Sequence, residues 1–120
     1  MDLMKIQDLF RATDEADADR LTRYLHPELV LNMVGVEGVE KPLDRPTYLA
    51  FLAESVRDRE GRRERTEHLP THVKIEGSVI AVRGFLKITC PDEPDAYHPY
   101  TDLLKLRDGQ IVEYNIAYDI

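Results

Sequence analysis

The fold is decided by the stretch from Tyr100 to Asp119, which reads YTDLLKLRDGQIVEYNIAYD. Asp108-Gly109 lies between two runs rich in apolar and β-branched residues, and Asp-Gly is a strong signal for a two-residue hairpin turn. We therefore predict two antiparallel strands joined at this turn. The first strand is unusual because Asp102 lies two residues into it, among side chains that should be half buried.

The turn also predicts a register for this hairpin. With a two-residue turn, Arg107 faces Gln110, and counting back along both strands places Asp102 opposite Asn115. The same face is expected to carry Tyr100, Leu104, Leu106 and Ile111. The opposite face is expected to carry Thr101, Leu103, Lys105, Val112, Tyr114, Ile116 and Tyr118. Apolar walls with a few convergent polar groups are typical of a pocket floor, and the alternative is a sheet edge where Asp102 meets water.

Three stretches predict helices because their apolar residues recur at helical spacing: residues 3–12, 18–25 and 46–57. Asp17 is placed to cap the second helix. The polar pair at residues 13–14 is expected to break the pattern of the first helix. All three helices are predicted before the long run of strands that follows.

Strands dominate the rest of the chain. ELVLNMVGV (28–36) reads as a strand because it is rich in apolar and β-branched residues, with Asn32 as its only polar interior residue. HLPTHVKIE (68–76) and VIAVRGFLKITC (79–90) read as further strands, with Gly84 as a candidate bulge. Helices followed by sequential strands predict an α+β fold with an antiparallel sheet.

Composition narrows the class of protein. The chain has 120 residues, 42% of them hydrophobic, which suits a single globular domain over residues 1–120. Sixteen basic and 23 acidic side chains give a net charge of −7, which disfavours nucleic acid and anionic membranes as partners. The single Cys90 cannot form an intrachain disulfide, and no apolar run reaches the roughly 20 residues that span a bilayer. A cytoplasmic location is therefore expected.

The order of these elements, and the ending YTDLLKLRDGQIVEYNIAYD (100–119), resemble the nuclear transport factor 2-like superfamily. That superfamily includes SnoaL-like polyketide cyclases, ketosteroid isomerases and limonene-epoxide hydrolases. The resemblance covers nearly the whole chain, and Asp119 matches the aspartate that closes the family's last strand. It implies a cone-shaped, cystatin-like α+β fold, with N-terminal helices packed on a strongly curved antiparallel sheet. One such fold hosts many activities.

The ketosteroid isomerases offer one set of correspondences. Their strand aspartate before the last hairpin stays protonated in apolar surroundings and donates to the developing oxyanion, and Asp102 falls at that position. Their catalytic base lies eight residues after a helix tyrosine, where Tyr24 is followed here by Asn32. A carboxamide cannot accept the proton, and the oxyanion tyrosine would fall near Asp8 or Leu9. The resemblance therefore implies that steroid isomerisation by that mechanism is absent.

The epoxide hydrolases and the cyclases offer two more sets of correspondences. Asn32 resembles the first-strand asparagine that helps hold the attacking water in epoxide hydrolases, and Arg83 falls at the position of their central arginine. That arginine normally lies between two aspartates, where this chain has Phe85 and Ile116. SnoaL-like cyclases use an aspartate as acid and base in the cavity, and Asp102 is the nearest match.

Each proposed catalytic residue also has a structural alternative. Asp102 in an apolar cavity would have a raised pKa and could act as acid or base, but an ion pair with Arg83 on the neighbouring strand would lower that pKa. Asn32 could serve the cavity or simply bond to backbone or bound water. Arg83 could pair with Asp102 or a substrate carboxylate, or reach solvent.

Aromatic and histidine side chains supply candidates for ligand binding. Tyr24, Tyr48 and Tyr100 could line the cone with phenol donors, or could be core and rim aromatics. His68 and His72 would lie roughly 13 Å apart on a strand, too far to share a metal ion, although one of them could reach the cavity.

The remaining polar candidates are expected to be structural. Cys90 has no partner histidine nearby in sequence, so it is not expected to be a nucleophile. His26 and His98 are expected on the surface, and Asp119 is interpreted as a structural or dimer-edge residue. No cluster of Cys, His and Asp predicts a metal site, and neither a metal nor an organic cofactor is expected.

Together these observations predict a SnoaL-like protein that binds a small apolar molecule, with Asp102 and Asn32 pointing into one cavity. If it is an enzyme, it would be a cofactor-independent isomerase, cyclase or hydrolase; the alternative is a non-catalytic ligand-binding or dimerisation module. The predicted catalytic residues are Asp102, Asn32 and Arg83. The predicted ligand-binding residues are Tyr24, Tyr48, His68, Tyr100 and Asn115. A homodimer through the outer face of the sheet is expected.

Overall fold

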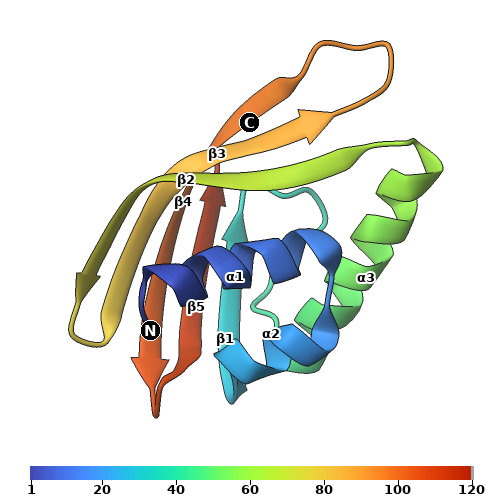
Figure 1. Cartoon of the computed structure of the whole chain (residues 1–120). Helices are drawn as coiled ribbons and strands as arrows, with labels where there is room; N and C mark the ends of the chain where they lie inside the picture. Colours follow the sequence, from blue (N-terminus) through green and yellow to red (C-terminus); the bar gives the residue numbers. More distant parts are fainter. Residues whose placement is uncertain (120) are drawn as a thin grey trace.

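The computed structural model describes residues 1–119, which form three helices and one five-stranded sheet (Figure 1). The elements follow the chain as α1 (Leu3–Glu15), α2 (Ala18–Tyr24), β1 (Leu25–Val34), α3 (Arg45–Gly61), β2 (Arg65–Glu76), β3 (Val79–Thr89), β4 (Ala96–Arg107) and β5 (Gln110–Tyr118). The predicted α+β class and the order of helices and strands are confirmed.

Each helix begins directly after an aspartate. The carboxylates of Asp2, Asp17 and Asp44 each accept a hydrogen bond from a backbone N–H in the first turn, which satisfies a donor that has no partner within the helix. The first helix continues past the polar pair at residues 13–14, which was predicted to break it, and ends at Ala16 in the left-handed conformation (φ 51°). The last turn of α1 therefore remains helical.

The five strands follow the order β1-β5-β4-β3-β2, and the helices lie on one face of the curved sheet (Figure 1). Strand β2 passes above α1 in this view, while α3 stands beside the sheet near β1. Pairs β2–β3, β3–β4 and β4–β5 are antiparallel, as predicted. The pair β1–β5 is parallel. After β1 the chain crosses through α3 to β2 at the far edge of the sheet, and it then comes back strand by strand until β5 lies beside β1.

A bulge in β5 changes the register of the final hairpin. Leu106 pairs with Ile111 as predicted, but Lys105 pairs with Glu113, so Val112 is an extra residue on β5. Beyond the bulge every partner moves by one position, and the predicted faces of the hairpin are wrong from there on. Tyr114, Ile116 and Tyr118 lie on the inner face with Asp102, and Asn115 lies on the outer face.

A second bulge lies in β2, opposite Gly84. Pro70 pairs with Gly84, but His72 pairs with Arg83, so Thr71 is the extra residue. The predicted bulge at Gly84 is therefore on the partner strand. A Cβ atom at Gly84 would lie 2.3 Å from the carbonyl oxygen of Leu69, which explains why only glycine fits here.

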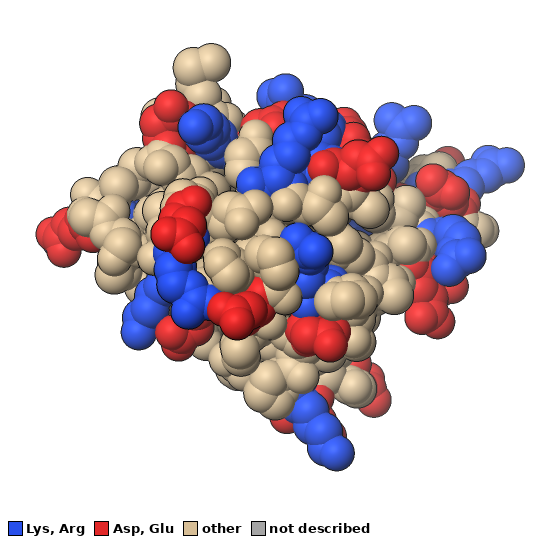
Figure 2. All heavy atoms as spheres, turned by 90° about the horizontal axis from the view of Figure 1, so that it is seen from below, with Lys and Arg blue, Asp and Glu red and all other residues tan. Residues whose placement is uncertain are grey.

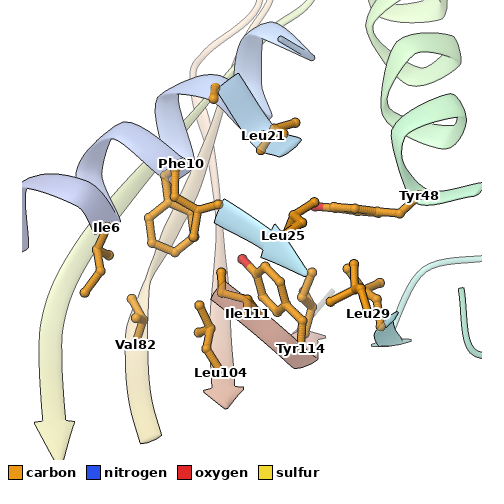
Figure 3. Packing of buried hydrophobic residues seen from close by; sticks show 14 of the residues in the cluster. Ile6, Phe10, Leu21, Leu25, Leu29, Tyr48, Val82, Leu104, Ile111 and Tyr114 are labelled. Atoms are coloured by element: carbon orange, nitrogen blue, oxygen red, sulfur yellow. The ribbon is translucent and has the colours of Figure 1, made fainter. Parts of the chain in front are cut away.

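The hydrophobic core fills the space between the helices and the inner face of the sheet (Figure 3). Ile6 and Phe10 project from α1 toward Val82 and Leu104, and Tyr48 reaches in from α3. These side chains are all buried. The core holds the cone together and leaves its wider part, beside α3, for a cavity.

The molecular surface carries charges of both signs. Figure 2 shows one face, seen from below, on which acidic and basic side chains are interspersed without an extended area of one sign. Within residues 1–119, no helix is both long enough and apolar enough to cross a membrane.

Candidate active site

A cavity of about 480 Å³ lies between α3, the last turn of α1 and the inner face of the sheet. Its apolar lining comes from Met33, Val36, Phe51, Leu52, Leu86, Ile88 and Ile116. Its polar lining includes Thr13, Asp14, Tyr48, Ser55, Asp58, Arg59, Arg62, Glu64, Thr66, His68, His98, Asp102, Tyr114 and Tyr118. A volume of this size can enclose a small organic molecule.

Asp102 forms the acidic part of the cavity floor. It lies on the inner face of β4, between Val82 and Ile116 on the neighbouring strands, and is 2% exposed. Its Oδ2 accepts a hydrogen bond of 3.0 Å from the hydroxyl of Tyr114. Its Oδ1 has no hydrogen-bond partner among residues 1–119. One carboxyl oxygen is therefore held, and the other is buried without a partner in this part of the protein.

Burial raises the pKa of Asp102 from its ordinary value of 3.8 to about 7, because apolar surroundings penalise the charged carboxylate. The His68 ring and the hydrogen bond from Tyr114 oppose this rise in the pKa, because both favour the ionised form. Near neutral pH, Asp102 is therefore shared between its acid and carboxylate forms. The acid form can carry its proton on Oδ1 and donate it to a ligand.

His68 and Asp14 form a second polar pair in the cavity wall. Nδ1 of His68 lies 2.7 Å from Oδ1 of Asp14, and the backbone N–H of His68 donates to Oδ2 at 2.9 Å. A carboxylate only accepts hydrogen bonds, so Nδ1 carries a proton, and in the neutral ring Nε2 keeps its lone pair. The hydroxyl of Tyr118 lies 3.3 Å from Nε2 and can donate to it. His68 is thereby oriented as a base.

Aromatic rings fix the plane of the His68 imidazole. Phe10 stacks on it with ring centroids 5.1 Å apart, and Tyr100 meets it edge-on at 5.2 Å. Burial raises the pKa of the Tyr114 and Tyr118 hydroxyls well above the ordinary value, so both remain neutral donors. The cavity therefore combines a carboxylic acid, an oriented imidazole and two phenols, which is a set suited to general acid–base chemistry.

Three predicted site residues line this cavity: Asp102, Tyr48 and His68. Tyr100 lies on the same inner face, 2% exposed, and contacts His68, but it does not line the cavity. Its hydroxyl has no hydrogen-bond partner among residues 1–119. Tyr100 therefore packs against the His68 ring without lining the cavity itself.

Asn32 and Asn115 do not reach the cavity. They are neighbours on the outer face of the sheet, where Nδ2 of Asn32 donates to Oδ1 of Asn115 at 3.1 Å. The prediction that Asn32 and Asp102 share one cavity is therefore wrong. The β5 bulge accounts for Asn115, and alternation along β1 places Leu31 and Met33, rather than Asn32, on the inner face.

Arg83 and Tyr24 also lie elsewhere. Arg83 is exposed on the outer face of β3, because its neighbour Val82 is the residue that pairs with Asp102. The ion pair with Asp102, which was one of the alternatives for Arg83, is therefore absent, and Arg83 reaches solvent as the other alternative predicted. Tyr24, at the end of α2, donates a hydrogen bond to Asp8 in the middle of α1, outside the cavity. Neither residue can contact a ligand bound beside Asp102.

The sequence interpretation missed several lining residues, above all Asp14, Tyr114 and Tyr118. Asp14 follows Phe10 by one helical turn, so its position on the buried stripe of α1 was a usable signal. Tyr114 and Tyr118 were assigned to the outer face, because the bulge was not recognised. His98 was expected on the surface, but it lines the cavity.

Among residues 1–119, no three His, Cys, Asp or Glu side chains lie close enough together to hold a metal ion. Cys90 is half-buried at the end of β3 and is not part of the cavity lining.

Sequence comparison finds no relative: no protein-family model matches the chain, and no curated protein is similar to it. Solved structures are similar in three dimensions. IdmH from Streptomyces antibioticus, a candidate polyketide cyclase, matches with a TM-score of 0.79 at 20% sequence identity, over 96% of this chain and 89% of that chain. An LEH-like epoxide hydrolase from M. tuberculosis matches with a TM-score of 0.72 at 15% identity, over 98% and 81%.

A third structure extends the likeness. A protein with a ketosteroid isomerase-like fold from Catenulispora acidiphila, solved in complex with trimethylamine, matches with a TM-score of 0.76 at 12% identity, over 100% of this chain and 88% of that chain. At such low identities, the likeness establishes the fold alone. The cone-shaped fold expected from the sequence is confirmed.

Proposed function

We propose that this chain, which has the fold of the nuclear transport factor 2-like superfamily, is a SnoaL-like protein that binds a small apolar molecule in its cavity. Apolar side chains cover much of the wall, and the polar groups gather around Asp102 and His68. Such a lining suits a compact, largely apolar ligand that carries one or two oxygen atoms. We also propose a cytoplasmic location.

The chemistry that the site supports best is proton transfer without a cofactor. Asp102 donates the proton on Oδ1 to a carbonyl or similar oxygen of the ligand, and Nε2 of His68 accepts a proton from the same molecule. This pair of roles serves isomerisation, cyclisation or hydrolysis. The observation that carries the proposal is the buried Oδ1 of Asp102, which has no hydrogen-bond partner among residues 1–119 and belongs to a carboxyl with a pKa of about 7.

A non-catalytic ligand-binding module is the second candidate. Two of the three residues expected to be catalytic, Asn32 and Arg83, lie on the outer face. In addition, Nε2 of His68 already has a hydrogen-bond partner in Tyr118, at 3.3 Å. In this second function, the same polar groups would orient a ligand without changing it.

The test is to identify the ligand and then to measure how its binding and turnover depend on pH. Native mass spectrometry of the purified protein should reveal a bound small molecule, which is then supplied to the protein and to Asp102→Asn. Turnover with a pH profile that changes in Asp102→Asn supports acid–base catalysis. Tight binding without turnover supports the second candidate.

A matched control is Asp58→Asn, because Asp58 is an exposed carboxylate that also lines the cavity but is far less buried than Asp102. We expect this variant to keep the wild-type pH profile. If Asp102→Asn also keeps the wild-type affinity and pH profile for a ligand seated in the cavity, the role of Asp102 is refuted.

A homodimer through the convex face of the sheet is also proposed. The outer face is the one expected, but three of its predicted members, Tyr114, Ile116 and Tyr118, lie inside the cone instead. Its support is instead a set of exposed apolar side chains: Val30, Val34, Val79, Phe85 and Leu103. Such an exposed group on a small protein is typical of an interface between subunits.

A further inference from the structure

Four side chains from three elements form a continuous hydrogen-bonded chain that ends at His68. Nη1 of Arg59, on α3, donates to Oγ1 of Thr66 at 2.6 Å. Thr66, on β2, donates to Oδ1 of Asp14 at 3.2 Å, and the same oxygen lies 2.7 Å from Nδ1 of His68. All four residues line the cavity, so the chain runs along its wall.

Arg59 fixes the direction of the Thr66 hydroxyl. A guanidinium can only donate, so the oxygen of Thr66 must accept from Arg59. The single hydroxyl proton of Thr66 is then free to point at Asp14. The Asp14 carboxylate only accepts, so Oδ1 takes a hydrogen bond from Nδ1 of His68 as well as from Thr66, and the bond from Thr66 holds Oδ1 in place for the imidazole. The proton of the neutral imidazole is thereby placed on Nδ1, and the lone pair on Nε2.

The surroundings keep these four groups in place. The side chains of His68 and Asp14 are only 7% and 13% exposed, so water cannot readily replace their mutual hydrogen bond. The second oxygen of Asp14 is held by the backbone N–H of His68 at 2.9 Å. At the other end, Nε of Arg59 donates to the carbonyl oxygen of Ser55 at 3.1 Å, which ties the guanidinium to α3.

We infer that Arg59 and Thr66 are positioning residues, which hold the proton of His68 on Nδ1 and keep Nε2 as the atom presented to the ligand. The inference depends on the proposed function in one respect: it takes Nε2 as the atom that reacts with the ligand. The tautomer of His68 can be measured without a ligand. Arg59, near the end of α3, therefore acts on the tautomer of His68 through the Thr66 hydroxyl and the Asp14 carboxylate.

The decisive variant is Thr66→Val, which keeps the shape of the side chain and removes its hydroxyl. Long-range ¹H–¹⁵N NMR of the imidazole, at a pH where the ring is neutral, gives the ratio of the Nδ1–H and Nε2–H tautomers. We expect this ratio to fall about fivefold in Thr66→Val, the change that the loss of one ordinary hydrogen bond produces. Thr66→Ser restores the hydroxyl and should restore the ratio.

A matched control comes from the same strand. Thr71 lies on β2 with its Oγ1 2.9 Å from Nδ1 of His72, on the outer face. Thr71→Val therefore removes a threonine hydroxyl beside a different histidine. We expect it to leave the tautomer ratio of His68 unchanged, which excludes a general effect of removing a hydroxyl from β2.

Arg59→Met provides a second, independent variant, should Thr66→Val fail to fold. It should lower the same ratio, because the Thr66 hydroxyl then has no enforced direction. Arg59→Lys keeps a donor and should preserve the ratio. Arg57→Met, at an exposed arginine on α3, is the control and should have no effect. An unchanged ratio in both Thr66→Val and Arg59→Met would overturn the inference.

The result is separable from the proposed function. A changed tautomer ratio in a protein that binds no ligand in its cavity supports the positioning role and refutes the proposed function. An unchanged ratio in a protein whose ligand handling depends on Asp102 refutes the positioning role alone.

Discussion

The hydroxyl of Tyr114 donates a hydrogen bond of 3.0 Å to Oδ2 of Asp102 and leaves Oδ1 of that carboxyl without a partner among residues 1–119. The two residues lie on adjacent strands of one hairpin, on its buried face. This bond fixes the orientation of the carboxyl group. We propose that a ligand completes the hydrogen bonding of the other, buried oxygen.

The first prediction concerns stability and pH. The pKa of Asp102 is about 7 in the folded protein and 3.8 ordinarily, so the folded state holds the proton more tightly than the unfolded state. The stability that this proton provides is complete below pH 4 and is lost as pH rises through 7. Each pH unit between the two pKa values is worth about 1.4 kcal/mol.

Asp102→Asn removes this titration while it keeps the shape of the side chain. Between pH 4 and 8, we expect the free energy of unfolding of the wild type to fall by up to about 4 kcal/mol relative to the variant. Urea denaturation of both proteins at several pH values measures the difference. Parallel stability curves would show that Asp102 has the same pKa in the folded and unfolded states.

The second prediction concerns Tyr114→Phe. Removal of the hydroxyl takes away a hydrogen bond that favours the ionised carboxylate, so the pKa of Asp102 should rise above 7, by about 1. The variant should also lose about 1 kcal/mol of stability where Asp102 is ionised. The ¹³C shift of the Asp102 carboxyl, followed by NMR against pH, reports the change. A lowered pKa would contradict the assigned hydrogen bond.

The third prediction concerns the outer face. Asn32→Ala removes the hydrogen bond to Asn115 and leaves that amide without its partner, which should cost about 1 kcal/mol of stability. Because both side chains lie outside the cone, the affinity for any ligand of the cavity should not change. Chemical denaturation tests the predicted loss of stability, and calorimetric titration tests the unchanged ligand affinity. A loss of ligand affinity without a loss of stability would restore Asn32 to the site.

The fourth prediction concerns Gly84→Ala. The added Cβ would lie 2.3 Å from the backbone oxygen of Leu69 and 2.9 Å from the hydroxyl of Tyr100, so the two strands must move apart. We expect a loss of about 2 kcal/mol or more in the free energy of unfolding. Gly61→Ala is the control, because an added Cβ there would meet no atom within 4 Å. Equal stabilities of the two variants would contradict the close approach at the β2 bulge.

The fifth prediction concerns self-association. Val34 and Leu103 are exposed on the convex face, at 66% and 39%. A lysine at either position would bury an unpaired charge in the interface, so Val34→Lys and Leu103→Lys should each weaken a homodimer by about tenfold or more. Sedimentation velocity at micromolar concentration measures the effect. Met4→Lys, at an exposed residue of α1, should leave the dimer intact, and a wild-type monomer would refute the proposal.

The limits of prediction from this sequence are clearest in the last hairpin. Asp108-Gly109 determined the turn correctly, because its chemistry is local. The bulge at Val112 was missed because the register was extended from the turn alone. The apolar spacing of β5 did contain the signal: Ile111 and Tyr114 are three residues apart, and strict alternation cannot place both on one face.

Asp14 shows a different limit. The periodicity of α1 predicts which side of the helix is buried, and Asp14 continues that side one turn after Phe10. Its partners, however, lie on β2, more than 50 residues away along the chain. Only the packing of α1 against the sheet brings them together, so local pattern could not predict the pair of Asp14 and His68.

The parallel pairing of β1 with β5 has a consequence for folding. Asn32 and Asn115 are hydrogen bonded across 83 residues of sequence, and β1 pairs with no other strand of the sheet. Contacts of such long range form slowly, because the intervening chain must be ordered before they contribute. Met33 and Ile116, which pair across these two strands, also line the cavity. We therefore expect the binding site to be among the last parts of the protein to form, and partly folded states to be unable to bind a ligand.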